Sequence, residues 1–237
     1  MRNEIAILMA AGKGERMRPI TLTTPKPLVK VHGVPMIETV IAGLERRGIK
    51  KIYVVVGYLK EAFQDLPSKY PNLELIENTE YTVKNNISSI HAAAHLMGRE
   101  DCFICEADLD VSDPSIFDAE LERSCYYGKL VEGHSDDWVF DLDADGQITR
   151  IGKYGEDAYN MCGICYLKQK EAKVIADAVL AAYQHPGHEN LFWDEIADQQ
   201  LPNLDLTVHP VRQDQIVEID SVAELKALDP TYGDLGY

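Results

Sequence analysis

The sequence lacks a membrane-length apolar run, an internal repeat and an excess of basic charge, and each absence narrows the range of functions. Its apolar stretches fall well short of the roughly 20 residues that a membrane-spanning helix needs. No repeat and no Ser/Gly-rich or charge-block linker interrupts the 237 residues, which argues against a solenoid or a string of separate domains. Lysine and arginine number 23 against 39 acidic residues, a net charge of −16, so we expect neither nucleic-acid nor membrane partners.

The first residues also lack the pattern of a secretory signal. The apolar run at residues 5–11 is short, follows Glu4 and leads into cations instead of a small-residue cleavage site. We therefore expect a cytoplasmic protein. With 46% apolar residues, the chain can bury one sizeable core, and we expect one domain over residues 1–237.

Cysteine is scarce, and its arrangement resembles a zinc site only superficially. Four of the five cysteines form two CxxC pairs, Cys102 with Cys105 and Cys162 with Cys165. Both pairs lie in apolar, strand-like runs, where positions three apart point to opposite faces. This favours buried structural thiols over zinc ligands, and an odd count in a cytoplasmic chain argues against a disulfide framework.

The most informative segment follows the first apolar run. Gly12 and Gly14 come directly after it, as expected where a buried strand opens into a loop whose backbone amides approach a ligand closely. Between Gly12 and Gly33, five cations face one acid, Glu15. These cations are Lys13, Arg16, Arg18, Lys26 and Lys30. The segment predicts a polyphosphate-binding loop.

Two familiar phosphate motifs do not match this loop. A Walker loop needs four residues between its glycines and then Lys with Ser or Thr, which GKGER does not supply. A dinucleotide fingerprint needs a third glycine where Met17 stands. The informative pattern is longer and comprises Gly12, Gly14, Arg16, Pro19, Thr21, Pro25, Lys26 and Pro27.

Strand-like and helix-like segments alternate after the loop. An apolar stripe at helical spacing over residues 36–47 ends at Gly48, a helix cap. Residues 51–58 and 73–78 read as strands, and residues 59–70 and 88–97 as helices. This alternation predicts an α/β fold with a parallel, doubly wound sheet.

Two aspartates follow predicted strands. Asp108 ends the apolar run that begins at Cys102, and Asp220 ends the strand IVEID, ahead of a capping box at residues 221–224. Carboxylates at strand ends beside a cationic loop suit a magnesium triphosphate, so Mg²⁺ is the expected cofactor. Asp141, Asp143 and Asp145 resemble the start of a calcium loop, but its closing glutamate is missing, so residues 138–150 predict a hairpin turn.

The loop pattern resembles that of the nucleotidyltransferases that activate sugar phosphates and phosphocholine with a nucleoside triphosphate. Over nearly the whole chain, the sequence is similar to the bacterial CTP:phosphocholine cytidylyltransferases. The segments that carry this similarity are GYLKEAF (57–63), NNISS (85–89), Asp137 with Trp138, FWDEIA (192–197) and EIDSV (218–222). The resemblance implies one Rossmann-like nucleotidyltransferase domain with a mostly parallel central sheet flanked by helices. Its nucleotide-binding part would span roughly residues 1–110 and its acceptor-binding part roughly 111–237.

The resemblance also implies roles for individual residues. Asp108 and Asp220 would hold magnesium, Arg16 would contact the triphosphate, and Lys26 would bridge the reacting phosphates. Lys153 is the candidate for the family's second lysine, at a longer spacing to Gly163 than usual. The nucleotide would contact residues in two stretches, Ala10, Ala11, Gly12 and Gly14 in the first and Asn85, Asn86 and Ser88 in the second.

The expected substrates are the small molecules CTP and phosphocholine, with CDP-choline and pyrophosphate as products. A trimethylammonium group has no N–H to donate and is bound by aromatic faces near a carboxylate. Both tryptophans adjoin aspartates, and the expected cage comprises Trp138, Phe192, Trp193 and Asp194.

Three alternatives stay open at this stage. A sugar-1-phosphate nucleotidyltransferase would share the loop and metal pair but bind its acceptor through hydrogen bonds. A cytidylyltransferase for 2-aminoethylphosphonate or phosphoethanolamine would bind a primary ammonium through carboxylates in preference to rings. A non-catalytic nucleotide-sensing subunit tends to lose Arg16, Lys26 or the aspartates, and all of these are present.

Overall fold

A computed structural model describes residues 3–233, and its centre is a seven-stranded sheet with the order β10-β8-β9-β6-β1-β4-β5. The strands are β1 (Glu4–Ala10), β4 (Lys51–Val56), β5 (Leu73–Glu77), β6 (Asp101–Glu106), β8 (Ser124–Leu142), β9 (Ile148–Leu167) and β10 (Leu206–Pro210). Strands β6, β1, β4 and β5 run parallel, as does β10 beside β8, whereas β9 is antiparallel to both of its neighbours. The predicted fold class, a mostly parallel α/β sheet flanked by helices, is confirmed.

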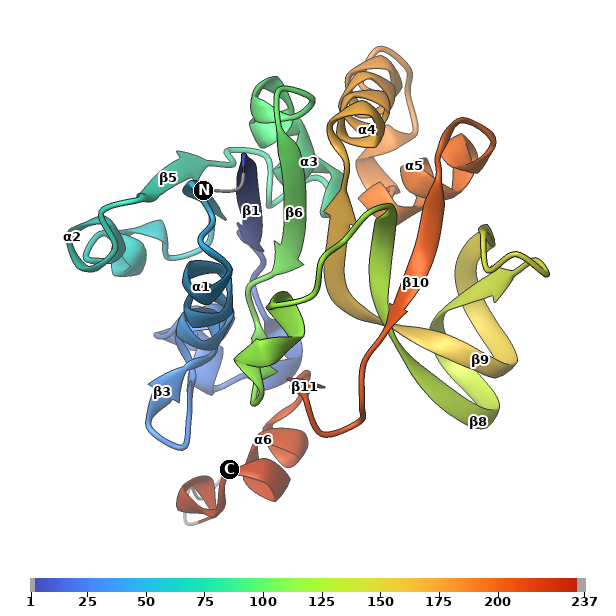
Figure 1. Cartoon of the computed structure of the whole chain (residues 1–237). Coiled ribbons are helices and arrows are strands. Elements are labelled where there is room, and N and C mark those ends of the chain that lie inside the picture. The colour runs from blue at the N-terminus through green and yellow to red at the C-terminus, as the bar shows by residue number, and fades with distance from the viewer. Residues whose placement is uncertain (1–2, 234–237) are drawn as a thin grey trace.

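Helices cover both faces of the sheet. The alternation of side chains along a strand sends Ala6 and Leu8 to one face and Ile5 and Ile7 to the other. Helix α1 (Met36–Arg47) packs on the first face, and α3 (Ile87–Ala93), α4 (Gln169–Ala182) and α5 (Trp193–Gln200) pack on the second (Figure 1). As predicted, α1 ends at Gly48, whose positive φ of 81° is the left-handed conformation of a C-cap.

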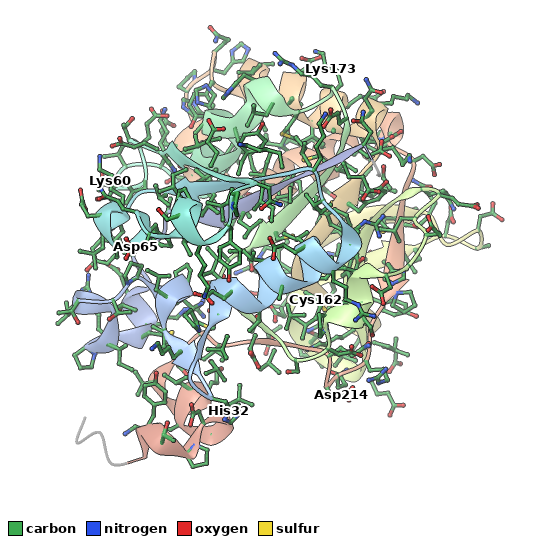
Figure 2. All side chains as sticks on the ribbon, turned by 60° about the vertical axis from the view of Figure 1, so that its left-hand side comes forward. His32, Lys60, Asp65, Cys162, Lys173 and Asp214 are labelled. Atoms are coloured by element: carbon green, nitrogen blue, oxygen red, sulfur yellow. The ribbon has the colours of Figure 1, made fainter. Side chains whose placement is uncertain are left out.

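The cysteines follow the same alternation. Cys102 and Cys165 belong to the core under α4, whereas Cys105 and Cys162 belong to the core under α1. In Figure 2, Cys162 lies among the ribbons, while Lys60, Asp65, Lys173 and Asp214 lie at the periphery. All five cysteines are buried free thiols, as the spacing predicts, and neither CxxC pair faces a common point.

The segment at residues 59–70 differs from its prediction as one helix. It forms a 3₁₀ turn at Lys60–Phe63 and a separate short helix, α2 (Leu66–Lys69). Pro67 lies in the first turn of α2, where it is tolerated, but its ring and missing N–H do not allow a helix to continue through it from residue 60. The break therefore has a local cause in the sequence.

Two small sheets complete the fold. Strands β2 (Lys30–Val31) and β3 (Val34–Pro35) form a hairpin, and β7 (Leu109–Val111) pairs antiparallel with β11 (Ile216–Glu218). Helix α6 (Val222–Leu228) follows β11 with the predicted capping box at Ser221 and Glu224. Within residues 3–233, none of the helices combines the length and apolarity that crossing a membrane requires.

A small third core joins segments that are far apart in the sequence. Met17 and Val29 of the cationic loop pack with Ile219, which precedes Asp220, and with Leu225, which lies on α6. The pairing of Glu218 with Leu109 then brings the end of β11 beside Asp108. This packing brings the loop and both aspartates together, and β11 and α6 lie on the side of the molecule where β1 and β6 end (Figure 1).

Candidate active site

A cleft of about 580 Å³ lies at the carboxyl ends of β1 and β6. This is the edge at which open α/β sheets bind ligands. The cleft gathers all the site residues predicted from the sequence except Trp193. Those that line it are Ala10, Ala11, Gly12, Gly14, Arg16, Lys26, Asn85, Asn86, Ser88, Asp108, Trp138, Lys153, Phe192, Asp194 and Asp220. Their roles in binding and catalysis stay predictions.

The cationic loop folds back on Lys26. Gly14 adopts a left-handed φ of 60°, and a Cβ at this position would lie 2.9 Å from the Cβ of Lys26. The hydroxyl of Thr21 donates to the carbonyl oxygen of Gly14 at 2.8 Å and fixes the turn. A residue with a Cβ at this position would be strained and would collide with Lys26.

Lys26 contacts both aspartates. Its Nζ lies 2.7 Å from Asp108 Oδ2 and 2.7 Å from Asp220 Oδ1, and the guanidinium of Arg16 lies 2.8 Å from the same oxygen of Asp220. Burial alone would lower the pKa of Lys26, but the two ion pairs outweigh it and raise that pKa. Within the described part of the chain, no group of three or more His, Cys, Asp or Glu side chains could hold a metal ion. That Asp108 and Asp220 bind magnesium stays a prediction.

Five more carboxylates, those of Glu15, Glu106, Asp137, Asp194 and Glu218, line the cleft. Burial, reinforced by repulsion between neighbouring acids, raises the pKa of Glu106 and of Glu218. Burial also raises the pKa of Asp194 to about 7, although Tyr126 donates a hydrogen bond to it at 3.0 Å. A cation in this part of the cleft would stabilise the ionised form of each acid.

The aromatic part of the cleft is smaller than predicted. Trp138 and Phe192 line it and meet edge to face, with ring centroids 5.5 Å apart. Trp193 is only 3% exposed and stacks on Tyr126 in the core under α4 and α5, 5.7 Å between centroids. The expected four-residue cage therefore needs correction, because Trp193 packs in the core and offers no face to the cleft.

The wall formed by residues 78–89 is closely hydrogen-bonded. Asn78 donates from Nδ2 to the hydroxyls of Ser88, at 2.9 Å, and Ser89, at 3.2 Å. Lys153 lies across the cleft, paired with Trp138 in the β8–β9 register. The cleft thus has a polar wall before α3 and a mixed aromatic and acidic wall on β8, β9 and α5.

Sequence reasoning assigned no role to several residues of the cleft wall. Glu106 and Glu218 each precede a predicted aspartate by two positions, and the period of two along an extended strand could have indicated them. Asn78, Tyr81 and Lys84 lie in or beside the segment that follows β5, and no pattern in the sequence distinguishes them. They reach the cleft through the tertiary fold alone.

Comparisons with known proteins show which family and which fold this chain matches. A model of the MobA-like NTP transferase domain matches residues 6–140. The chain is 54% identical to 2-aminoethylphosphonate cytidylyltransferase of Lancefieldella rimae, over 96% of this chain and 92% of that one. It is 31% identical to choline-phosphate cytidylyltransferase of Streptococcus pneumoniae, over 94% of this chain and 96% of that one. A solved structure of CTP:phosphocholine cytidylyltransferase from Streptococcus pneumoniae is similar with a TM-score of 0.88 and 30% identity, covering 97% of this chain and 99% of that one.

Proposed function

The chain belongs to the family of MobA-like NTP transferase domains, and we propose that it is a cytidylyltransferase that couples CTP to 2-aminoethylphosphonate. This acceptor replaces phosphocholine, the one expected from the sequence. The relative that is 54% identical is named for 2-aminoethylphosphonate, whereas the relative named for choline phosphate is 31% identical.

The observation that carries the proposal is the acidic character of the wall on β8, β9 and α5, which we call the acceptor wall. A primary ammonium has three N–H donors and requires oxygen acceptors, while a trimethylammonium group has none and requires aromatic faces. Five carboxylates line the cleft apart from Asp108 and Asp220, those of Asp137 on β8 and Asp194 on α5 belong to this wall, and Trp193 lies in the core. This balance of carboxylates over rings favours a primary ammonium.

The reaction follows from the groups that meet in the cleft. An oxygen of the phosphonate forms a bond to the α-phosphorus of CTP, and the bond from that phosphorus to the bridging oxygen breaks. The bonding electron pair leaves with pyrophosphate. Phosphoryl-transfer chemistry of this kind depends on positioning and charge stabilisation, so no protein nucleophile is required. Arg16, Lys26 and the amides of residues 12–14 would orient the phosphates.

The two aspartates fit a divalent cation. Both carboxylates contact one atom, the Nζ of Lys26, so their oxygens converge on one point. Two carboxylates would occupy only part of the coordination sphere of Mg²⁺ and leave positions for phosphate and water oxygens. Asp108 and Asp220 would therefore hold Mg²⁺, which when bound supplies charge neutralisation on the phosphates and the leaving pyrophosphate. Lys26, released from the aspartates, would then be free to contact a phosphate oxygen.

Phosphocholine is the second candidate acceptor. The edge-to-face pair of Trp138 and Phe192 offers two ring surfaces beside Asp137 and Asp194, which would suit a quaternary ammonium. The similarity to the Streptococcus pneumoniae enzyme, with a TM-score of 0.88, supports the same choice.

The test is pyrophosphate release with CTP and Mg²⁺, measured for each acceptor separately. The panel comprises 2-aminoethylphosphonate, phosphoethanolamine, phosphocholine and glucose 1-phosphate. We expect the highest kcat/KM with 2-aminoethylphosphonate and a lower value when UTP or dTTP replaces CTP. A preference for phosphocholine would favour the second candidate, activity only with glucose 1-phosphate would indicate a sugar nucleotidyltransferase, and silence throughout would favour a nucleotide sensor.

A further inference from the structure

Asn86, predicted to contact the nucleotide, directs its side chain to the helix of the opposite wall. It lies directly before α3, and its Oδ1 accepts a hydrogen bond from the backbone N–H of Trp193 at 2.9 Å. Its side-chain amide also acts on the carboxylate of Asp194, whose pKa it lowers by favouring the ionised form. Both contacts are with the first two residues of α5.

These contacts meet specific needs of α5. The first N–H groups of a helix have no partner within the helix, and Asn86 supplies one for Trp193 from another segment. An amide side chain reads a base edge when its oxygen and its nitrogen face that edge together. Because the oxygen of Asn86 accepts from the start of α5, the amide is not free to turn both ends toward a base.

Asp194 is fixed from a second side. The hydroxyl of Tyr126 donates to its Oδ1 at 3.0 Å, and the aspartate is 4% exposed at the edge of the cleft. Tyr126 is fully buried in the core under α5. Asn86 and Tyr126 therefore act on one carboxylate. Asn86 acts from the polar wall before α3, and Tyr126 acts from the core.

The neighbouring Asn85 strengthens the same connection. Its backbone N–H donates to the carbonyl oxygen of Glu189 at 2.8 Å, and its Nδ2 donates to that of Asn190 at 3.2 Å. The segment before α3 is thus hydrogen-bonded to residues 189–194 at several successive points. Displacing either wall of the cleft would strain the other.

We propose that Asn86 is a positioning residue for the acceptor, which fixes Asp194 and the start of α5, and that it does not read the base. The inference rests on the proposed function, in that Asp194 faces the acceptor's ammonium. It predicts that loss of the Asn86 side chain weakens acceptor binding while CTP recognition is retained.

The kinetic test compares Asn86→Ala with Asn203→Ala. Asn203 bonds the side chain of Gln200 at the far end of α5 and provides a matched control. For Asn86→Ala we expect the KM for 2-aminoethylphosphonate to rise about tenfold, since the hydrogen bond that holds the start of α5 is lost beside Asp194. The KM for CTP and the ratio of CTP to UTP turnover should stay within about twofold. A rise in the CTP KM or a relaxed CTP preference, with the acceptor KM unchanged, would overturn the proposal.

A second variant separates positioning from a loss of folding. Tyr126→Phe removes the other donor to Asp194 without changing the ring, and should raise the acceptor KM alone. In the double variant the two effects should not add, because both act through one carboxylate. Additive effects would contradict a shared action on Asp194.

Hydrogen–deuterium exchange tests the position of Asn86 independently of activity. In Asn86→Ala, a peptide covering residues 191–195 should exchange faster than in the wild type, while peptides from β1 and β4 should not change. Unchanged exchange at residues 191–195 would refute the contact with α5 even in an active enzyme. Faster exchange in a protein that fails to use 2-aminoethylphosphonate would instead leave the contact supported and the proposed acceptor wrong.

Discussion

Among single residues, Lys26 has the most contacts with opposite charge in the cleft. Its ammonium lies between Asp108 and Asp220, at the point where we propose that a divalent cation binds. An ammonium and a metal ion cannot share this point, so each compensates the two carboxylates only in the absence of the other. Lys26 is thus both a phosphate ligand in the proposed reaction and a structural cation.

Lys26→Met should separate these two contributions. Turnover should fall at least 100-fold, as for other groups that stabilise charge in a transition state. The free energy of unfolding should drop by about 1–3 kcal/mol, less than for a fully buried pair because the aspartate side chains are 24% exposed. Thermal unfolding should then show that Mg²⁺ without nucleotide stabilises the variant more than the wild type.

Lys60→Met is the matched control for that stability effect. Lys60 pairs with Glu77 at the surface, with both side chains at least 40% exposed, and such pairs contribute at most about 1 kcal/mol. If Mg²⁺ stabilises wild type and Lys26→Met equally, the ion does not take the place of the ammonium.

Asp194 should make the stability of the protein depend on pH. Burial raises its pKa to about 7, so between about pH 4 and pH 7 the folded protein keeps a proton that the unfolded chain releases. The contribution of Asp194 to stability therefore falls as pH rises through this window. Asp194→Asn should be more stable than wild type at about pH 8, and this difference should shrink to near zero at about pH 4, by urea unfolding, while its acceptor KM rises. Equal stabilities at both pH values would show that Asp194 titrates normally.

Among the elements, local patterns predicted those that depend on local sequence. The stripe of α1, its cap at Gly48, strands β4 and β5, and the capping box of α6 all follow the periodicities of the sequence. For the long strands β8 and β9, the sequence predicted only the hairpin turn at residues 138–150. The register of this strand pair shifts at several points, and Val139 pairs with both Gly152 and Asn160. Such a bent pairing depends on tertiary packing that no local sequence pattern encodes.

The position of Trp193 in the core could have been predicted from its place at the start of a helix. Neighbouring residues at the start of a helix do not share a face, which argues against Phe192 and Trp193 entering one cavity together, although the expected cage contained both. The structure turns Phe192 to the cleft and Trp193 to the core. The motif FWDEIA therefore contributes one ring and one carboxylate to the cleft, whereas the expected cage included two of its rings.

The loop after β1 depends on the backbone freedom of Gly14. Gly14→Ala would force a Cβ to 2.9 Å from that of Lys26 at a φ of 60°. We expect a loss of about 1–3 kcal/mol in unfolding free energy from the strained backbone, together with reduced turnover as Lys26 shifts. Gly12→Ala is the stability control, because no atom lies within 4 Å of its added Cβ. A Gly14→Ala protein as stable as Gly12→Ala would show that the loop tolerates another conformation.

For the whole molecule, the cleft combines segments separated by most of the chain length. The third core of Met17, Val29, Ile219 and Leu225 brings the cationic loop to Asp220, and the pairing of β7 with β11 adds Asp108. Sequence reasoning could place each aspartate at a strand end, and the resemblance to a family suggested that they meet. It could not foresee that Asn86 serves α5, because a contact between residues 86 and 193 leaves no local trace.

The central claim is that the carboxylates of the acceptor wall select a primary ammonium. The most direct measurement is kcat/KM with CTP for 2-aminoethylphosphonate and its N-methyl, N,N-dimethyl and N,N,N-trimethyl derivatives, which keep the phosphonate constant. The account predicts that each methyl lowers kcat/KM, because each removes an N–H donor that the carboxylates accept. A value that rises with methylation and is highest for the trimethyl compound would contradict it and favour the rings of Trp138 and Phe192 as the selecting groups.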